Sequence, residues 1–168
     1  MNSNNVNTMK SSIALKHIRR SNDPVGDAIT RIRNAHTRMF DSVIIPKSNQ
    51  ITCILDALIR SGYILHYENC GPNNKKDHLT NLKIARFTHV NVFLKYHNSL
   101  PAIQNMQRIS SPGKRIYFSK KKIKQYAKAQ GWGLTKTLIL STSKGIFTHQ
   151  EVLKLKANMG GESLCFVW

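Results

Sequence analysis

Leu138-Ile139-Leu140-Ser141-Thr142-Ser143-Lys144-Gly145 joins an apolar run directly to three hydroxyl side chains, an ammonium group and a glycine. The apolar run, with Thr137 before it, predicts a strand that places these polar groups at its own end. A second polar turn, Gly160-Gly161-Glu162, comes shortly before the apolar run from Leu164 to Trp168. We expect the two turns to lie side by side, supported or extended by the rest of the chain.

The charge of the chain predicts a polyanionic partner. Its 168 residues include 26 Lys and Arg against 8 Asp and Glu, a formal net charge of +18. Residues 82–168 hold 15 of the basic residues and 2 of the acidic ones, so the C-terminal half is the more positive. A bound polyanion would offset the self-repulsion, and nucleic acid is the first candidate. A membrane surface is the second, by peripheral binding alone, because no apolar run approaches the roughly 18 residues of a span.

The groups that catalysis or metal binding would need are scarce or badly placed. Ser141 and Lys144 have the Ser-x-x-Lys spacing of a nucleophile, but that chemistry needs both on one helical turn. Glu151 and Glu162 are the two acids of the last half, so a general acid–base pair has few candidates. The seven His and three Cys show no metal-ligand spacing. We therefore expect no catalysis, cofactor or metal, with the histidines at the surface or facing RNA and the cysteines at least half-buried.

Glu162 has two interpretations that the residues leave open. A lone acid in so basic a half is either a structural anchor or an acceptor for a base amino group or a ribose hydroxyl. The hydroxyls of Ser141–Ser143 can donate to phosphate. Tyr117 can stack on a base, whereas Trp132 and Phe147 are predicted to be core residues.

The N-terminal part is predicted to alternate helices and strands. One helix begins at Pro24 with Asp23 as its N-cap, and a second is capped by Ser48 and stopped at Gly62. The predicted strands are Val43–Ile45, Tyr63–Glu68, Leu82–Phe87 and Val90–Tyr96, with a loop over residues 69–81.

The C-terminal part is predicted to be mainly antiparallel sheet with short helices. The strand Ile103–Ile109 leads into the turn Ser111-Pro112-Gly113, and Arg115–Phe118 is expected to pair back across it. Ser119 is expected to cap a helix that bears five lysines. Thr148 begins the capping box of a last short helix, and a final strand ends the chain.

These elements predict an α+β fold with two small domains. The predicted domains are residues 22–97 and a C-terminal RNA-binding domain of residues 98–168, joined near Asn98–Pro101. Residues 1–21 form a basic extension without any acid. Its composition is that of an organellar transit peptide or of a tail that contacts RNA, and we expect the tail to be retained.

Three ordered motifs resemble those of a known family. They are Arg108-Ile109-Ser110-Ser111-Pro112-Gly113-Lys114-Arg115-Ile116-Tyr117, then Leu140 to Gly145, then Gly160-Gly161-Glu162 with Cys165 and Val167-Trp168. Asp23-Pro24, Thr30-Arg31-Ile32-Arg33-Asn34-Ala35 and Ile45-Pro46 followed by Ser48 look like the first part of the same family. From about Asn22 to Trp168 the chain resembles the eighth protein of the small ribosomal subunit, in its bacterial or organellar form.

The resemblance implies a non-catalytic structural protein that binds an irregular stem in the central domain of small-subunit rRNA and aids its early assembly. Its implied partners are that rRNA and neighbouring ribosomal proteins, with no membrane and no independent homo-oligomer. The implied RNA-binding residues are Ser141, Thr142, Ser143, Lys144 and Glu162 for the main contact, Arg108, Ser110, Lys114, Arg115 and Tyr117 for a second, and Thr30, Arg31, Asn34 and Ser48 for a lesser one.

The chain also departs from the family pattern. Ser163 stands where the family has Ile or Val, which predicts a weaker or partner-facing start to the last strand, and Asn49 replaces a Lys at the N-terminal contact. The tail and the 69–81 loop predict an organellar ribosome, mitochondrial with plastid as the alternative. The alternative function is a free RNA-binding protein that regulates messenger RNA, and an enzyme acting on RNA is disfavoured.

Overall fold

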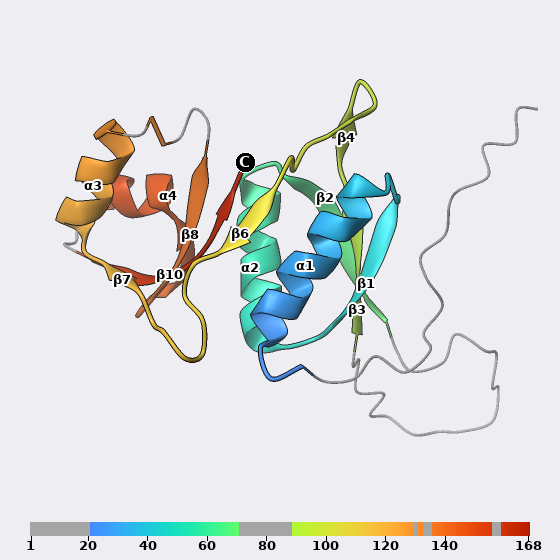
Figure 1. The fold of residues 1–168 in the computed structure, drawn as a ribbon, viewed down its shortest axis with the longest axis horizontal. Coiled ribbons are helices and arrows are strands. Elements are labelled where there is room, and N and C mark those ends of the chain that lie inside the picture. Colours follow the sequence, from blue (N-terminus) through green and yellow to red (C-terminus); the bar gives the residue numbers. More distant parts are fainter. Residues whose placement is uncertain (1–20, 71–88, 130, 133–135, 156–158) are drawn as a thin grey trace, which may run out of the picture.

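The computed structural model describes residues 21–70, 89–129, 131–132, 136–155 and 159–168 (Figure 1). The tail up to residue 20, the loop from residue 71 and the predicted strand Leu82–Phe87 lie outside the described residues. Helices and antiparallel sheets make up the described part, which confirms the predicted α+β class.

The N-terminal sheet has three antiparallel strands in the order β1-β3-β2. Its strands are β1 (Ser42–Pro46), β2 (Ile64–Cys70) and β3 (His89–Leu94), and its helices are α1 (Pro24–Thr37) and α2 (Asn49–Arg60). Both helices lie on one side of this sheet (Figure 1). Burial along β3 alternates, with Val90, Val92 and Leu94 turned inward, as expected for a strand with one packed face.

The C-terminal sheet is organised around its last strand, β10. Its elements are β6 (Met106–Arg108), β7 (Tyr117–Phe118), β8 (Thr137–Thr142), β9 (Gly145–Thr148) and β10 (Gly161–Val167). β8 pairs with one edge of β10 and with β9, while β6 and β7 pair with the other edge of β10 at opposite ends. The predicted hairpin between Ile103–Ile109 and Arg115–Phe118 is therefore wrong, because one edge of β10 is long enough to pair with two short strands in succession.

Both faces of the C-terminal sheet are covered. Leu138 and Leu140 pack in a cluster with Ile123 of α3 (Lys120–Ala129) and Val152 of α4 (His149–Lys154). Ile139, on the other face, belongs to the larger core that also contains residues of α1 and α2. A strand buried on both faces is apolar throughout, which explains the unbroken run from Leu138 to Leu140.

The two halves share that larger core. It contains Val25 and Leu58 from the N-terminal helices together with Met106 and Leu164 from the C-terminal sheet. The Tyr63 hydroxyl also donates to Thr137 Oγ1 at 2.9 Å. The predicted linker coincides with a small hairpin of β4 (Tyr96–His97) and β5 (Leu100–Pro101), after which β6 packs on α1.

Three of the predicted caps are confirmed and one is wrong. Ser48 Oγ accepts from the Ile51 N–H at 3.2 Å, Ser119 Oγ accepts from the Lys122 N–H at 3.4 Å, and Thr148 forms a complete capping box with Glu151. Gly62 follows α2 at φ +74°, in the left-handed region that favours glycine. Asp23 makes no side-chain cap, because its carboxylate is paired with Arg108 instead.

Thr148→Ala should lower the free energy of unfolding by about 1 kcal/mol, because it leaves the Glu151 N–H at the start of α4 without its acceptor. Urea denaturation followed by circular dichroism measures the change. Thr37→Ala is the matched control, since the exposed Thr37 hydroxyl donates to the Arg33 carbonyl within α1. The control should shift the free energy of unfolding by less than about 0.5 kcal/mol. Equal effects of the two substitutions would contradict the capping role.

Candidate nucleic-acid interface

Three strands bring the two polar turns together in one row. In the pairing register Glu162 of β10 lies opposite Ser141 of β8 on one side and opposite Tyr117 of β7 on the other. Tyr117 is 63 % exposed, and Ser141 and Glu162 are half-buried. The expectation that the two turns lie side by side is confirmed. The row consists of a hydroxyl, a carboxylate and an exposed aromatic ring.

The double glycine allows the strands to approach this closely. A Cβ atom on Gly161 would overlap the carbonyl oxygen of Ser141, and one on Gly160 would overlap the carbonyl oxygen of Phe118. The start of β10 therefore fits between the ends of β8 and β7 only because both positions lack a side chain.

The turn between β8 and β9 presents two exposed residues, Ser143 and Lys144. The Thr142 hydroxyl holds the turn, since it donates to the Gly145 carbonyl at 2.8 Å and accepts from the Lys144 N–H at 3.3 Å. β8 continues two residues beyond the predicted strand, to Thr142, so the Ser-x-x-Lys tetrapeptide lies across a strand end and a turn rather than on a helix. This geometry does not match the helical arrangement of a Ser–Lys nucleophile.

The carboxylate of Glu162 is held by donors from the segment between β6 and β7. Its Oε1 accepts from the Ser110 hydroxyl and, at 2.6 Å, from Arg115 Nη1. Burial raises the pKa of Glu162, but the bonds from Ser110 and Arg115 and the charges of Arg115 and Arg108 outweigh it, so the pKa lies below its usual value. Ser110 is fully buried, so its side chain positions Glu162 rather than facing a ligand.

The turn of the β6–β7 segment, residues 112–115, is exposed to solvent. Ser111 and Lys114 close its tight turn through two backbone hydrogen bonds, of 3.0 and 3.1 Å. Lys114 and Arg115 are exposed on this turn. The predicted second contact therefore divides into exposed cations, an exposed Tyr117 and a buried hydroxyl that supports Glu162.

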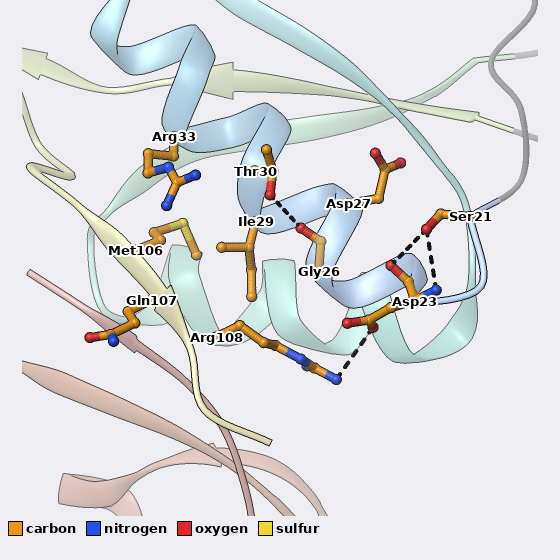
Figure 2. Close-up of a pocket in the computed structure, with 10 residues that line it drawn as sticks. All are labelled: Ser21, Asp23, Gly26, Asp27, Ile29, Thr30, Arg33, Met106, Gln107 and Arg108. Atoms are coloured by element: carbon orange, nitrogen blue, oxygen red, sulfur yellow. Dashed lines mark hydrogen bonds and ion pairs between the residues drawn. The ribbon is translucent and has the colours of Figure 1, made fainter. Parts of the chain in front are cut away.

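A groove of about 430 Å³ lies beside this row, between the start of α1 and β6 (Figure 2). Arg108 lines it, with its Nη2 paired to Asp23 Oδ1 at 3.4 Å. Nε and Nη1 of Arg108 are buried and have no hydrogen-bond partner among the described residues. Thr30 and Arg33 of α1 line the same groove. The structure thus places predicted residues from both halves, Thr30 and Arg108, around one concavity.

The remaining predicted N-terminal residues lie on α1, which lines this groove, or at the start of α2. Arg31 is paired with Asp27 at 2.8 Å, Asn34 is exposed on α1, and the Ser48 hydroxyl caps α2. The starts of α1 and α2 and the segment between β6 and β7 lie along the same edge of the molecule, the lower edge in Figure 1.

Several expectations about polar residues are wrong. His36 and His149 are 2 % and 1 % exposed rather than at the surface, and burial lowers the pKa of both. Ser163 is fully buried, and its hydroxyl donates to the Ile116 carbonyl at 2.9 Å, so it faces neither a partner nor solvent. Cys53 is exposed. The Leu138 N–H donates to His149 Nδ1 at 3.1 Å, whereas both ring nitrogens of His36 are buried without a hydrogen-bond partner among the described residues.

Sequence reasoning missed the roles of Asp23 and Arg33. Asp23 anchors Arg108 across the two halves, and Arg33 adds a second guanidinium to the groove (Figure 2). No group of metal-ligating side chains occurs among the described residues. None of the helices in the described ranges is long and apolar enough to cross a membrane.

Comparison with known proteins agrees with the family that the motifs resemble. The sequence profile described as Ribosomal protein S8 matches residues 23–168. The chain belongs to the ribosomal protein S8 family. Small ribosomal subunit protein uS8 of Dictyoglomus thermophilum is 38 % identical over 146 residues, which cover 87 % of this chain and 97 % of that protein. The protein of the same name from Campylobacter hominis is 38 % identical over 148 residues, covering 88 % and 98 %.

Gly161→Ala in this S8-family chain should cost about 1–3 kcal/mol of stability, because the new Cβ atom must displace the β8 backbone at Ser141. Urea denaturation measures the loss, and hydrogen exchange should show weaker protection of β8. Gly113→Ala is the matched control, since a Cβ atom there meets nothing within 4 Å. If Gly161→Ala is as stable as the control, the close approach is not required.

Glu162 should make the stability of the chain depend on pH. Its pKa is lower in the folded state than the usual 4.5, so its contribution is fully present above pH 4.5 and is lost as the pH falls through the folded-state pKa. The difference in unfolding free energy between the wild type and Glu162→Gln should be constant from pH 5 to 7 and shrink below. Urea titrations at half-unit pH intervals measure it. A difference that stays constant down to pH 3 would contradict the assignment.

Proposed function

We propose that this chain is a structural component of the small ribosomal subunit that binds an irregular stem in the central domain of small-subunit rRNA. The row of Ser141, Glu162 and Tyr117 is the observation on which the proposal rests. The curated relatives are small-subunit proteins by name, and the family is structural rather than catalytic. The chain is accordingly proposed to aid assembly of the central domain, together with neighbouring ribosomal proteins.

In this proposal charge attracts the RNA and the row recognises its shape. Lys144 and Arg115 lie exposed on either side of Glu162 and supply attraction to phosphates without regard to sequence. An A-form duplex hides its base edges in a deep, narrow major groove, whereas an irregular stem exposes bases and ribose hydroxyls. Ser141 can donate to such groups, and Tyr117 can stack on an unpaired base.

Glu162 fits both interpretations that the residues left open. Its Oε1 anchors Ser110 and Arg115, which is the structural role. Its Oε2 has no hydrogen-bond partner among the described residues and can accept from a base amino group or a ribose hydroxyl. Two internal donors on one oxygen keep the carboxylate charged and fixed in direction. The hydrogen bonds to Oε1 thereby orient Oε2 to accept a hydrogen bond from the RNA.

The groove beside the row is proposed as the second contact. The unpartnered Nε and Nη1 of Arg108 are buried donors that a phosphate oxygen entering the groove would satisfy. Arg33 and Thr30 border the same space. The proposed boundary between domains of residues 22–97 and 98–168 would then lie beside bound RNA. The location on a mitochondrial ribosome, with plastid as the alternative, stays a prediction, since the relatives compared are bacterial.

Binding of the full chain to an irregular central-domain stem and to a fully paired duplex of equal length tests the proposal. Lys144→Ala should weaken binding to both RNAs and lower the slope of log K against log salt by about one unit or less. Glu162→Ala should instead lower the preference for the irregular stem. Arg38→Ala is the charge-matched control, because Arg38 is exposed just beyond the far end of α1.

Either of two outcomes would contradict the proposal. One is a wild-type chain that binds the stem no better than the duplex. The other is an undiminished preference in Glu162→Ala, which would remove the discriminating role of the row. Sedimentation separates the remaining alternative, since a ribosomal component stays with small subunits through washes in moderate salt and a free regulator of messenger RNA does not.

A further inference from the structure

Helix α3 forms a second strongly basic surface, outside the row and the groove. It begins two residues after β7 and lies at the end of the molecule farthest from the β1-β3-β2 sheet (Figure 1). Four of its lysines are exposed: Lys121, Lys122, Lys124 and Lys128. We call Lys121, Lys124 and Lys128 the α3 stripe, because spacings of three and four residues place them along one side of the helix.

The α3 stripe has no acidic partner within the described part of the chain. No ion pair there involves any of its three ammonium groups, and the two acids of the C-terminal half are engaged elsewhere. Glu151 is paired with Arg60 at 2.9 Å, and Glu162 with Arg115 at 2.6 Å. The stripe is therefore uncompensated positive charge on a rigid element.

The lysines of α3 destabilise this helix electrostatically. Lysines occupy positions 120 to 122 in its first turn, where the helix dipole favours acidic residues, and no acid is present there. Lys121 with Lys124, and Lys124 with Lys128, are like-charge neighbours that also destabilise an isolated helix. A local conflict of this kind in a folded protein is typical of a functional surface.

The shape of this surface is set by aromatic packing beneath it. Tyr126 stacks on Phe118 and on Trp132, with ring centroids 5.7 Å apart in both pairs. Lys122 Nζ lies 5.0 Å from the centre of the Phe118 ring. These contacts occupy the rings, so the surface offers cations and hydroxyls rather than a free stacking platform. A hollow of about 490 Å³ between Lys121 and Tyr126 runs along it.

We propose that the α3 stripe binds the sugar–phosphate backbone of RNA, at a site separate from the row and without sequence preference. The inference rests on the proposed function, since it assumes that the chain's polyanionic partner is RNA. An acidic protein is the weaker candidate, because protein interfaces are depleted in lysine and centre on buried apolar anchors. Tyr126, at 36 % exposed, is the one large apolar residue of α3 that reaches the surface in the described structure.

The test compares the full-length K121A/K124A/K128A variant with K121R/K124R/K128R, which keeps the charge. Alanine and arginine are both good helix formers, and circular dichroism checks that α3 is retained. The probe is a fully paired 20-base-pair RNA duplex, titrated at several salt concentrations. The alanine variant should lose about two units of the slope of log K against log salt, whereas the arginine variant should match the wild type.

An unchanged slope in the alanine variant would overturn the proposal. If incorporation into small subunits then still falls, the stripe binds an acidic protein instead. Failure of the proposed function gives a different result, because the wild-type chain would then bind the irregular stem no better than the duplex. That comparison uses the wild-type chain, in which the α3 stripe is intact. A reduced slope together with an intact stem preference supports two separate RNA contacts.

Discussion

The pairing of β10 with three other strands is the constraint on which the rest of the structure depends. β8 occupies one edge of β10, and β6 and β7 share the other. The start of β10 fits between its neighbours only because Gly161, its first residue, and Gly160 just before it leave room for the neighbouring backbones. The proposals about the row depend on this position of β10, because it places Glu162 between the Ser141 hydroxyl on β8 and the exposed Tyr117 ring on β7.

Charge is distributed so that nearly all of the negative charge in the C-terminal half is used inside the protein. Glu151 caps α4 and pairs with Arg60, and Glu162 holds Ser110 and Arg115. The exposed lysines of that half, Lys144 among them, are then left without an ion pair among the described residues. A polyanion can lower the electrostatic energy of the folded chain without breaking any of its structural contacts.

The local elements were predictable where a single short-range rule decides. Ser48, Gly62 and Thr148 each act within four residues, and the sequence predicts their caps and stop correctly. Ion pairs and strand pairings between segments distant in sequence were not predictable from such local rules. Asp23 looked like a cap but pairs with Arg108, and Arg115–Phe118 looked like half of a hairpin but pairs with β10. In both cases the observed partner is distant in sequence and replaces the local partner that the sequence predicts.

The sequence by itself determined the class of fold and the family and predicted a polyanionic partner, because composition, periodicity and ordered motifs are properties of the chain alone. Tertiary structure decided which of the implied residues can reach a ligand. Ser110 is buried while Lys144 and Tyr117 are exposed, although all three are polar or basic residues in matching motifs. Exposure depends on which strands lie on either side, and strand order is fixed by pairings between segments far apart in sequence, such as Met106 of β6 with Val167 of β10.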